Sequence, residues 1–233
     1  MIDVRPFNSL GHFDHGWLNT RHHFSFAEYF DPARTQWGLL RVWNDDEIAA
    51  KTGFPRHGHR DMEIITYVRK GAITHRDSMG NEGVTRAGDV QVMSAGGGVL
   101  HEEWNLEGED TELFQIWILP REAGGEPYWK AAAFPKGDRA GKLEVLASGR
   151  PGRDALSIRA DGELLAGTLN AGDEITYDLE PGRFAYLVPA TGSVTVNGVA
   201  LDTRDGAAIT DEPHIVIKAK ETSEVVLVDT AGA

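Results

Sequence analysis

Residues 54–71, FPRHGHRDMEIITYVRKG, place two histidines directly before a segment with the composition of a β-strand. The run MEIITYV (62–68) is rich in β-branched residues, which favour strands. His57 and His59 are separated by one glycine, and residues i and i+2 of an extended chain project from the same face. The two imidazoles should therefore converge on one point. Taken alone, the pair fits two hydrated side chains in a surface loop, and a metal site requires further ligands.

Short strand-like segments continue on both sides of this stretch. Several of them alternate apolar with polar residues, which is the pattern of half-buried strands. Regular short strands, with turns about every 8–12 residues, indicate an all-β sandwich or barrel rather than βαβ units. In the first half the segments are WGLLRVW (37–43), AITHRDS (72–78), GVTRAGDVQVM (83–93), VLHEEWN (99–105) and LFQIWIL (113–119).

A weak internal repeat predicts two copies of one unit. EIITYVRKGAITHRD (63–77) is similar to FAYLVPATGSVTVNG (184–198), since each has an apolar strand, a turn ending in glycine and an alternating strand. Glycine, proline and charged residues interrupt the pattern between the two copies. We therefore expect an N-terminal arm and domain over residues 1–125, a linker with a short helix at YWKAAAF (128–134) over 126–142, and a C-terminal domain over 143–233.

The composition excludes several classes of function. The 233 residues carry a formal net charge of −13, and this argues against direct nucleic-acid binding, which needs clustered Lys and Arg. The chain has no cysteine, so any metal must be held by histidine and carboxylate. No apolar run approaches the roughly 18 residues of a membrane span, and no apolar signal region opens the chain. We expect a cytoplasmic protein.

A second pair of candidate ligands lies in VLHEEWN (99–105). His101 and Glu103 are again i and i+2, so they share one face of a strand while Glu102 points away. The two pairs would bring three imidazoles and one carboxylate into one small barrel, and each imidazole should donate its other ring N–H to a nearby acceptor. This set suits a divalent first-row metal with octahedral geometry and two open positions. The second half has a single histidine, His214, so no metal site is expected there.

HGHRDMEIITYVRKG (57–71), followed by GDVQVMSAGGGVLHEEWN (88–105), resembles the two cupin motifs, and specifically those of the pirin family. The resemblance extends through most of the chain, including GHFDHGWLNTRHHFSFAEYFDP (11–32) and FQIWILP (114–120). It implies an all-β fold of two tandem jelly-roll β-barrel (cupin) domains packed face to face, with metal only in the first. By motif match, the metal ligands of the family fall on His57, His59, His101 and Glu103.

The bacterial members of this family include quercetin 2,3-dioxygenases. The resemblance therefore implies one Fe(II) per chain, with Zn, Mn, Co, Ni or Cu as alternatives, and an enzyme that opens the central ring of flavonols such as quercetin with O₂ and releases carbon monoxide. Glu103 is then the expected base for the flavonol 3-hydroxyl, and the residues that bind substrate stay unknown. The family also includes nuclear regulators, so a non-enzymatic, metal-dependent redox-sensing protein is the alternative. A deep apolar pocket on the metal would favour the enzyme. A monomer is expected.

Other residues have simpler interpretations. Glu63 stands near the glutamate ligand of the general cupin motif, but we expect it to be structural or to support the ligands. His75 lies in an alternating strand, where it should pack or face solvent. The glycines of SAGGGVL (94–100) should turn a tight corner, because no phosphate-loop lysine or helix follows. Asp45 and Asp46 are expected in a turn. The arm histidines should form no second metal site, although one or two could border the pocket: His12, His15, His22 and His23.

Overall fold

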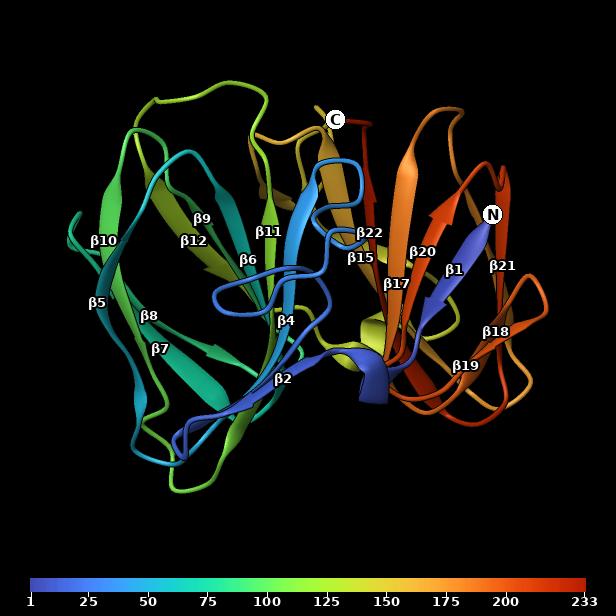
Figure 1. The fold of residues 1–233 in the computed structure, drawn as a ribbon, viewed down its shortest axis with the longest axis horizontal. Coiled ribbons are helices and arrows are strands. Elements are labelled where there is room, and N and C mark those ends of the chain that lie inside the picture. The colour runs from blue at the N-terminus through green and yellow to red at the C-terminus, as the bar shows by residue number, and fades with distance from the viewer.

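All 233 residues are described by a computed structural model, which arranges them as two β-barrels lying side by side (Figure 1). Each barrel consists of a seven-stranded sheet and a four-stranded sheet. Helical structure is limited to two 3₁₀ turns, η1 (Phe7–Ser9) and η2 (Lys136–Arg139). The predicted all-β fold of two tandem barrels is confirmed.

The N-terminal barrel contains the two stretches that carry the candidate ligands. Its strands pair antiparallel throughout, so neighbouring inward-facing residues can be read from the register. The small sheet has the order β5 (Gly53–His59), β10 (Val99–Trp104), β7 (Ala72–Asp77) and β8 (Glu82–Arg86). The large sheet has the order β12 (Tyr128–Ala132), β9 (Val90–Ser94), β6 (Glu63–Lys70), β11 (Thr111–Ile118), β4 (Leu40–Ile48), β3 (Leu18–His22) and β2 (Gly11–Asp14).

The C-terminal barrel repeats this arrangement around an apolar core. The small sheet has the order β16 (Glu174–Asp178), β21 (His214–Ala219), β18 (Val194–Val196) and β19 (Val199–Leu201). The large sheet has the order β1 (Ile2–Arg5), β20 (Gly206–Thr210), β17 (Phe184–Thr191), β22 (Ser223–Thr230), β15 (Gly162–Leu169), β13 (Glu144–Ser148) and β14 (Leu156–Ser157).

The large sheets of the two barrels pack against each other, which places the largest apolar cluster of the molecule between them. Trp43 and Phe114 from the first barrel meet Tyr186 from the second, with the Trp43 and Tyr186 rings 5.5 Å apart. A buried charge lies at the same interface. Asp45 accepts hydrogen bonds from Arg69 of the first barrel at 2.6 Å and from Arg204 of the second at 2.5 Å.

Three local expectations differ from the structure. YWKAAAF does not contain a helix, because residues 128–132 form β12 on the edge of β9. Pro127 and Pro135 confine this segment to a length too short for a stable helix, and its aromatic residues favour a strand. The first strand of the chain belongs to the C-terminal barrel, where Ile2 pairs with Ile209. Asp45 and Asp46 lie within β4 rather than in a turn.

Candidate metal centre

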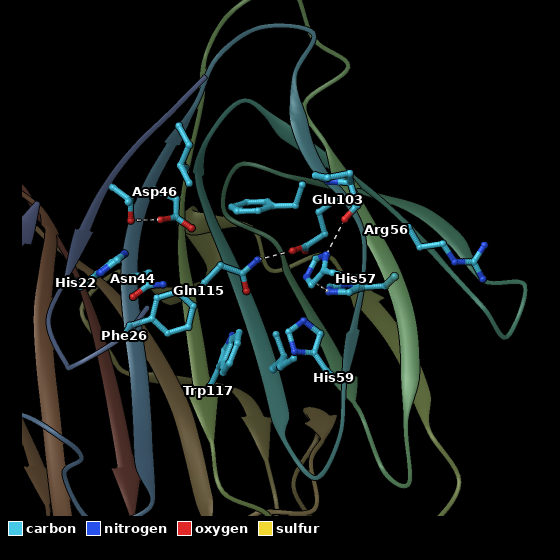
Figure 2. A pocket seen from close by; sticks show the side chains of 16 residues that line it. His22, Phe26, Asn44, Asp46, Arg56, His57, His59, Glu103, Gln115 and Trp117 are labelled. Atoms are coloured by element: carbon cyan, nitrogen blue, oxygen red, sulfur yellow. Dashed lines mark hydrogen bonds between the residues drawn. The ribbon is translucent and has the colours of Figure 1, made fainter. Parts of the chain in front are cut away.

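Three imidazoles converge at one end of the N-terminal barrel. His57 and His59 come from β5, and His101 comes from the neighbouring strand β10, where it is the register partner of His57. One ring nitrogen from each lies within 4.8 Å of the other two. The Nε2 atoms of His57 and His101 are only 3.0 Å apart. Figure 2 shows His57 and His59 reaching into the same cavity as Glu103.

The chemistry of these three rings fits a metal. Burial, followed by the nearby His57, His59 and His75, lowers the pKa of His101 to about 2. Burial and His57 lower the pKa of His59 to about 4. Neutral imidazoles are the form that binds divalent transition metals. The Nδ1 of His57 donates to the Pro55 carbonyl at 2.8 Å, so in the neutral ring Nε2 carries the lone pair and faces His101.

The predicted second hydrogen bond is not made by every ring. The Nδ1 of His57 has the Pro55 carbonyl, and the Nδ1 of His101 lies 3.4 Å from the Nδ1 of His75. His59 instead packs edge-on against Trp117, with the ring centroids 5.0 Å apart. The orientation of His59 is therefore set by aromatic packing.

Glu103 faces the interior of the barrel beside the histidines. Its Oε1 accepts a hydrogen bond from Gln91 Nε2 at 2.7 Å, and its Oε2 accepts one from Gln115 Nε2 at 2.6 Å. Burial raises the pKa of Glu103 to about 7, against the opposing effect of hydrogen bonds from Gln115, Thr66 and Gln91. These amides hold the carboxylate beside His101 and His75, so the four predicted ligands do not form one set within 4.8 Å.

His75 packs in the interior, which is one of the two positions expected for it, but its contact with His101 was not anticipated. Its Nε2 lies 3.1 Å from Asp77 Oδ2, and its ring stacks on Trp129 at 4.9 Å between centroids. Burial opposes ionisation of Asp77, but hydrogen bonds from Asn81 and His75 outweigh it and lower the pKa of Asp77. The i, i+2 spacing of His75 and Asp77 was the available signal, since it repeats the spacing of the ligand pairs.

A cavity of about 310 Å³ opens on the three imidazoles. Aromatic and aliphatic side chains form its sides, and Figure 2 shows Phe26 and Trp117 on the side opposite the histidine strands. One arm histidine, His22, borders this cavity as expected, whereas His23 is buried between the barrels against Tyr186. The apolar lining consists of Leu18, Phe26, Phe54, Pro55, Ile64 and Trp117.

A polar wall, formed by Thr20, Asn44 and Asp46, lines another part of the same cavity. Asp46 accepts a hydrogen bond from the Thr20 hydroxyl at 2.5 Å. Burial raises the pKa of Asp46 to about 7, with the Thr20 hydrogen bond opposing this rise and Asp45 and Glu103 adding to it. The cavity thus holds a second carboxyl group that the sequence analysis placed in a turn. Alternation along β4 puts residues 42, 44 and 46 on one face of the strand, and this pattern was the available signal for Asp46.

Glu63 is structural. Its carboxylate accepts hydrogen bonds from the Ser94 hydroxyl at 2.7 Å and from the backbone N–H of Arg159 at 2.9 Å, so it links the two barrels. The glycine corner is also present. Gly96 has φ +49°, and a Cβ there would lie 2.3 Å from the Gly125 carbonyl oxygen. No helix of the structure is long and apolar enough to cross a membrane.

Comparison with known proteins finds similar sequences and similar folds. Residues 3–118 match the family described as Pirin, and residues 145–230 match the quercetinase C-terminal cupin domain. A Pseudomonas aeruginosa protein that carries the name quercetin 2,3-dioxygenase provisionally is 62% identical over 232 residues, covering 99% of this chain and 100% of that protein. Quercetin 2,3-dioxygenase of Escherichia coli is 43% identical over 231 residues and 98% of each chain. The crystal structure of the E. coli bacterial pirin YhhW with nickel(II) has a TM-score of 0.94 at 40% identity and covers all of both chains.

Proposed function

Because the chain belongs to the pirin family and its second half matches a quercetinase C-terminal cupin domain, we propose that it is a metal-dependent dioxygenase acting on flavonols such as quercetin. One observation carries this proposal. A largely apolar, aromatic-lined cavity opens directly on three convergent imidazoles. Such a pocket favours the enzyme over the metal-dependent regulator, which would need a surface for a protein partner rather than a cavity for a small aromatic ligand.

The proposed centre holds one Fe(II) per chain through His57, His59, His101 and Glu103. The imidazole and carboxylate donors also suit Ni, Co, Cu, Zn and Mn, and a relative binds nickel(II). Glu103 lies beside the rings, with Oε1 accepting from Gln91 and Oε2 from Gln115, and the carboxylate keeps a further lone pair for a metal. When bound, the metal supplies a Lewis acid and open coordination positions.

The walls of the cavity select and orient a flat aromatic substrate. Phe26 and Trp117, whose rings meet edge to face at 5.3 Å, offer apolar contact on one side, and Ile64 adds an aliphatic surface. Aromatic contacts of this kind favour a planar ring system and exclude water from it. Because Trp117 also packs on His59, the residue that contacts substrate is the one that orients a proposed ligand.

Glu103 is the proposed base that takes the proton of the flavonol 3-hydroxyl. Its carboxylate is buried beside His101 and is held by two amides, so it is oriented before substrate arrives. The flavonolate so formed reacts with O₂, one carbon of the central ring leaves as carbon monoxide, and both oxygen atoms of O₂ enter the ring-opened ester. Asp46 is the competing candidate, since it is the other carboxyl group of the cavity.

The proposal is tested by stripping the protein of metal and reloading it with Fe(II), Ni(II), Co(II), Cu(II), Mn(II) or Zn(II) in separate samples. We expect turnover of quercetin only in loaded samples, with one O₂ consumed and one carbon monoxide released per flavonol. Absorbance, an oxygen electrode and a haem-protein carbon monoxide assay measure the three quantities. Metal-free protein is the control. Stoichiometric metal without flavonol cleavage for any of the six metals would contradict the enzyme.

Two matched variants then identify the base. Glu103→Gln should lower turnover by about 10²–10⁴-fold while keeping the shape of the side chain, and metal can remain at reduced affinity. Asp46→Asn should keep turnover within about tenfold of the parent. The reverse pattern would assign the proton transfer to Asp46. A cytoplasmic location and a monomeric state remain predictions from the sequence.

A further inference from the structure

A buried chain of three groups lies behind His101, on the side away from the cavity. The Nδ1 of His101 is 3.4 Å from the Nδ1 of His75, and the Nε2 of His75 is 3.1 Å from Asp77 Oδ2. The side chains of His75 and Asp77 are fully inaccessible to solvent. A carboxylate is therefore connected to a proposed metal ligand through one intervening ring.

The hydrogen-bonding partners determine which atom carries each proton. Asp77 accepts hydrogen bonds from the backbone N–H groups of Met79 and Asn81 at 2.9 and 3.0 Å, and from the Asn81 side chain at 2.9 Å. A carboxylate that receives so many donors is ionised and can only accept. The Nε2 of His75 must then carry a proton, and in the neutral ring its Nδ1 is an acceptor.

The same logic continues to the metal centre. Since His75 Nδ1 accepts, the Nδ1 of His101 is the donor, and the Nε2 of His101 holds a lone pair directed at His57 Nε2, 3.0 Å away. In a neutral His57 ring, Nε2 also holds a lone pair, because Nδ1 donates to a carbonyl. Two lone pairs at this distance repel each other unless a cation lies between them.

We propose that His75 and Asp77 are positioning residues, which fix the tautomer of His101 so that its Nε2 binds the metal and which extend the negative charge of Asp77 toward that ligand. The inference rests on the proposed metal centre, of which His101 is a member. Of the three imidazoles, only His101 is connected in this way to an anion. The partner of His57 is a neutral carbonyl, and His59 packs on the uncharged Trp117 ring.

The surroundings of His75 keep its ring in one orientation. The ring is nearly parallel to that of Trp129, with an interplanar angle of 6°. On the neighbouring strand, a Cβ at Gly83 would lie 2.2 Å from the Trp129 ring, so glycine leaves the space that the indole occupies. Trp129 belongs to β12, the segment expected to be helical. β12 thus supports the His75 ring, which in turn contacts the proposed ligand His101.

Asp77→Asn tests the proposal most directly. The new amide nitrogen would face His75 Nε2, which must then accept, so the His75 proton moves to Nδ1 and His101 loses its acceptor. The proton of His101 is driven to Nε2, where it blocks metal binding, as in other sites where an orienting Asp becomes Asn. We expect the affinity for Co(II) to fall by about 10–100-fold, with a changed Co(II) visible spectrum.

His75→Asn and His75→Leu provide the conservative and disruptive comparisons. The Asn carbonyl oxygen can stand near the former Nδ1 position and still accept from His101, so we expect less than about tenfold loss of Co(II) affinity. Leu offers no acceptor and should lose the full 10–100-fold. In the His75→Asn background, adding Asp77→Asn should cause no further loss. Asp178→Asn is the matched control, because Asp178 and His214 form an exposed pair at 2.7 Å in the other barrel.

Each outcome decides the inference. Equal Co(II) affinity and spectrum in Asp77→Asn and the parent would overturn it, and so would an additive loss in the double variant. Complete loss of binding in His75→Asn, with unchanged melting of the metal-free protein, would make His75 a ligand itself. If Asp77→Asn does not fold, the difference between His75→Asn and His75→Leu decides in its place. A parent protein that binds no metal at all refutes the proposed function, whereas parent-like binding in the variants refutes this inference alone.

Discussion

The two barrels have the same pair of sheets but different interiors. A cluster of 15 buried apolar residues fills the C-terminal barrel. In the N-terminal barrel two small apolar clusters, of five and four residues, flank a layer of polar side chains. Along β6, Ile64, Thr66 and Val68 alternate inward, so the change from apolar to polar and back occurs within one strand. The repeat aligns Thr66 with Leu187, a core residue of the second barrel.

This difference shows that the fold and the site depend on separate features of the sequence. Alternation of inward and outward residues specifies a barrel whether the inward residue is threonine or leucine. Only the identity of the inward residues creates a cavity with ligands. The polar layer is tolerated because its members satisfy each other, as when Gln91 donates both to Thr66 and to Glu103.

The largest expected effect is loss of the metal from the first barrel alone. His101→Ala should abolish binding of the single metal equivalent and flavonol cleavage together, because His101 lies within ligand distance both of the other two imidazoles and of Glu103. His214→Ala, in the second barrel, should change neither. Elemental analysis and quercetin turnover measure the effect, and circular dichroism should remain β-rich. A second tight equivalent of metal that survives in His101→Ala would break the contrast between the barrels.

Core truncation in the second barrel should separate stability from metal binding. Leu187→Ala deletes buried methyl groups at a fully enclosed position and should lower the free energy of unfolding by about 2–5 kcal/mol. Because Leu187 lies outside the barrel that holds the proposed metal centre, Co(II) affinity should not change. Urea unfolding and metal titration measure the two quantities. The aligned variant Thr66→Val should instead lower Co(II) affinity and leave the free energy of unfolding nearly unchanged. It keeps the side-chain volume but removes a hydrogen bond to Glu103. Altered Co(II) affinity in Leu187→Ala would mean that the barrels are coupled.

Metal removal should loosen one barrel only. A free metal concentration of 100 times the dissociation constant stabilises the folded chain by about 2.7 kcal/mol. Removal of the metal should therefore lower the melting temperature without unfolding the protein. Hydrogen exchange should then quicken in β5 and β10, which carry the ligands, while β16 and β21 keep their protection. Uniform acceleration in both small sheets would contradict a local role for the metal.

The smallest effect is a pH dependence that only a polar interior can produce. Burial raises the pKa of Asp46 to about 7, so the folded state holds its proton more tightly than the unfolded state does. The stability contributed by this proton is complete below about pH 4 and is lost as the pH rises through 7. In metal-free protein, the stability of Asp46→Asn relative to the parent should therefore rise between pH 4 and pH 8, because the variant has no carboxyl group to ionise. A constant difference from pH 4 to 8 would show that Asp46 does not titrate on folding.

The sequence predicted what depends on local pattern. Alternation identified the strands, and the spacing of His57, His59 and His101 brought their rings together. The misses depend on distant partners. Acidic residues are disfavoured in strands, so Asp45 appeared to belong to a turn, and only Arg69 and Arg204, both remote in sequence, make it acceptable in β4. The connection from Asp77 to His101 likewise exists only once β7 pairs with β10.

The placement of β1 has a consequence for how the chain is made. Ile2–Arg5 is synthesised before the N-terminal barrel, yet its partner β20 (Gly206–Thr210) is synthesised after that barrel. β1 therefore has no strand partner while the N-terminal barrel is translated. A fragment that begins at the linker would lack β1 and expose the edge of β20. Exposed strand edges tend to pair with other molecules. Expression of residues 143–233 alone would therefore give a C-terminal barrel that lacks one of its strands.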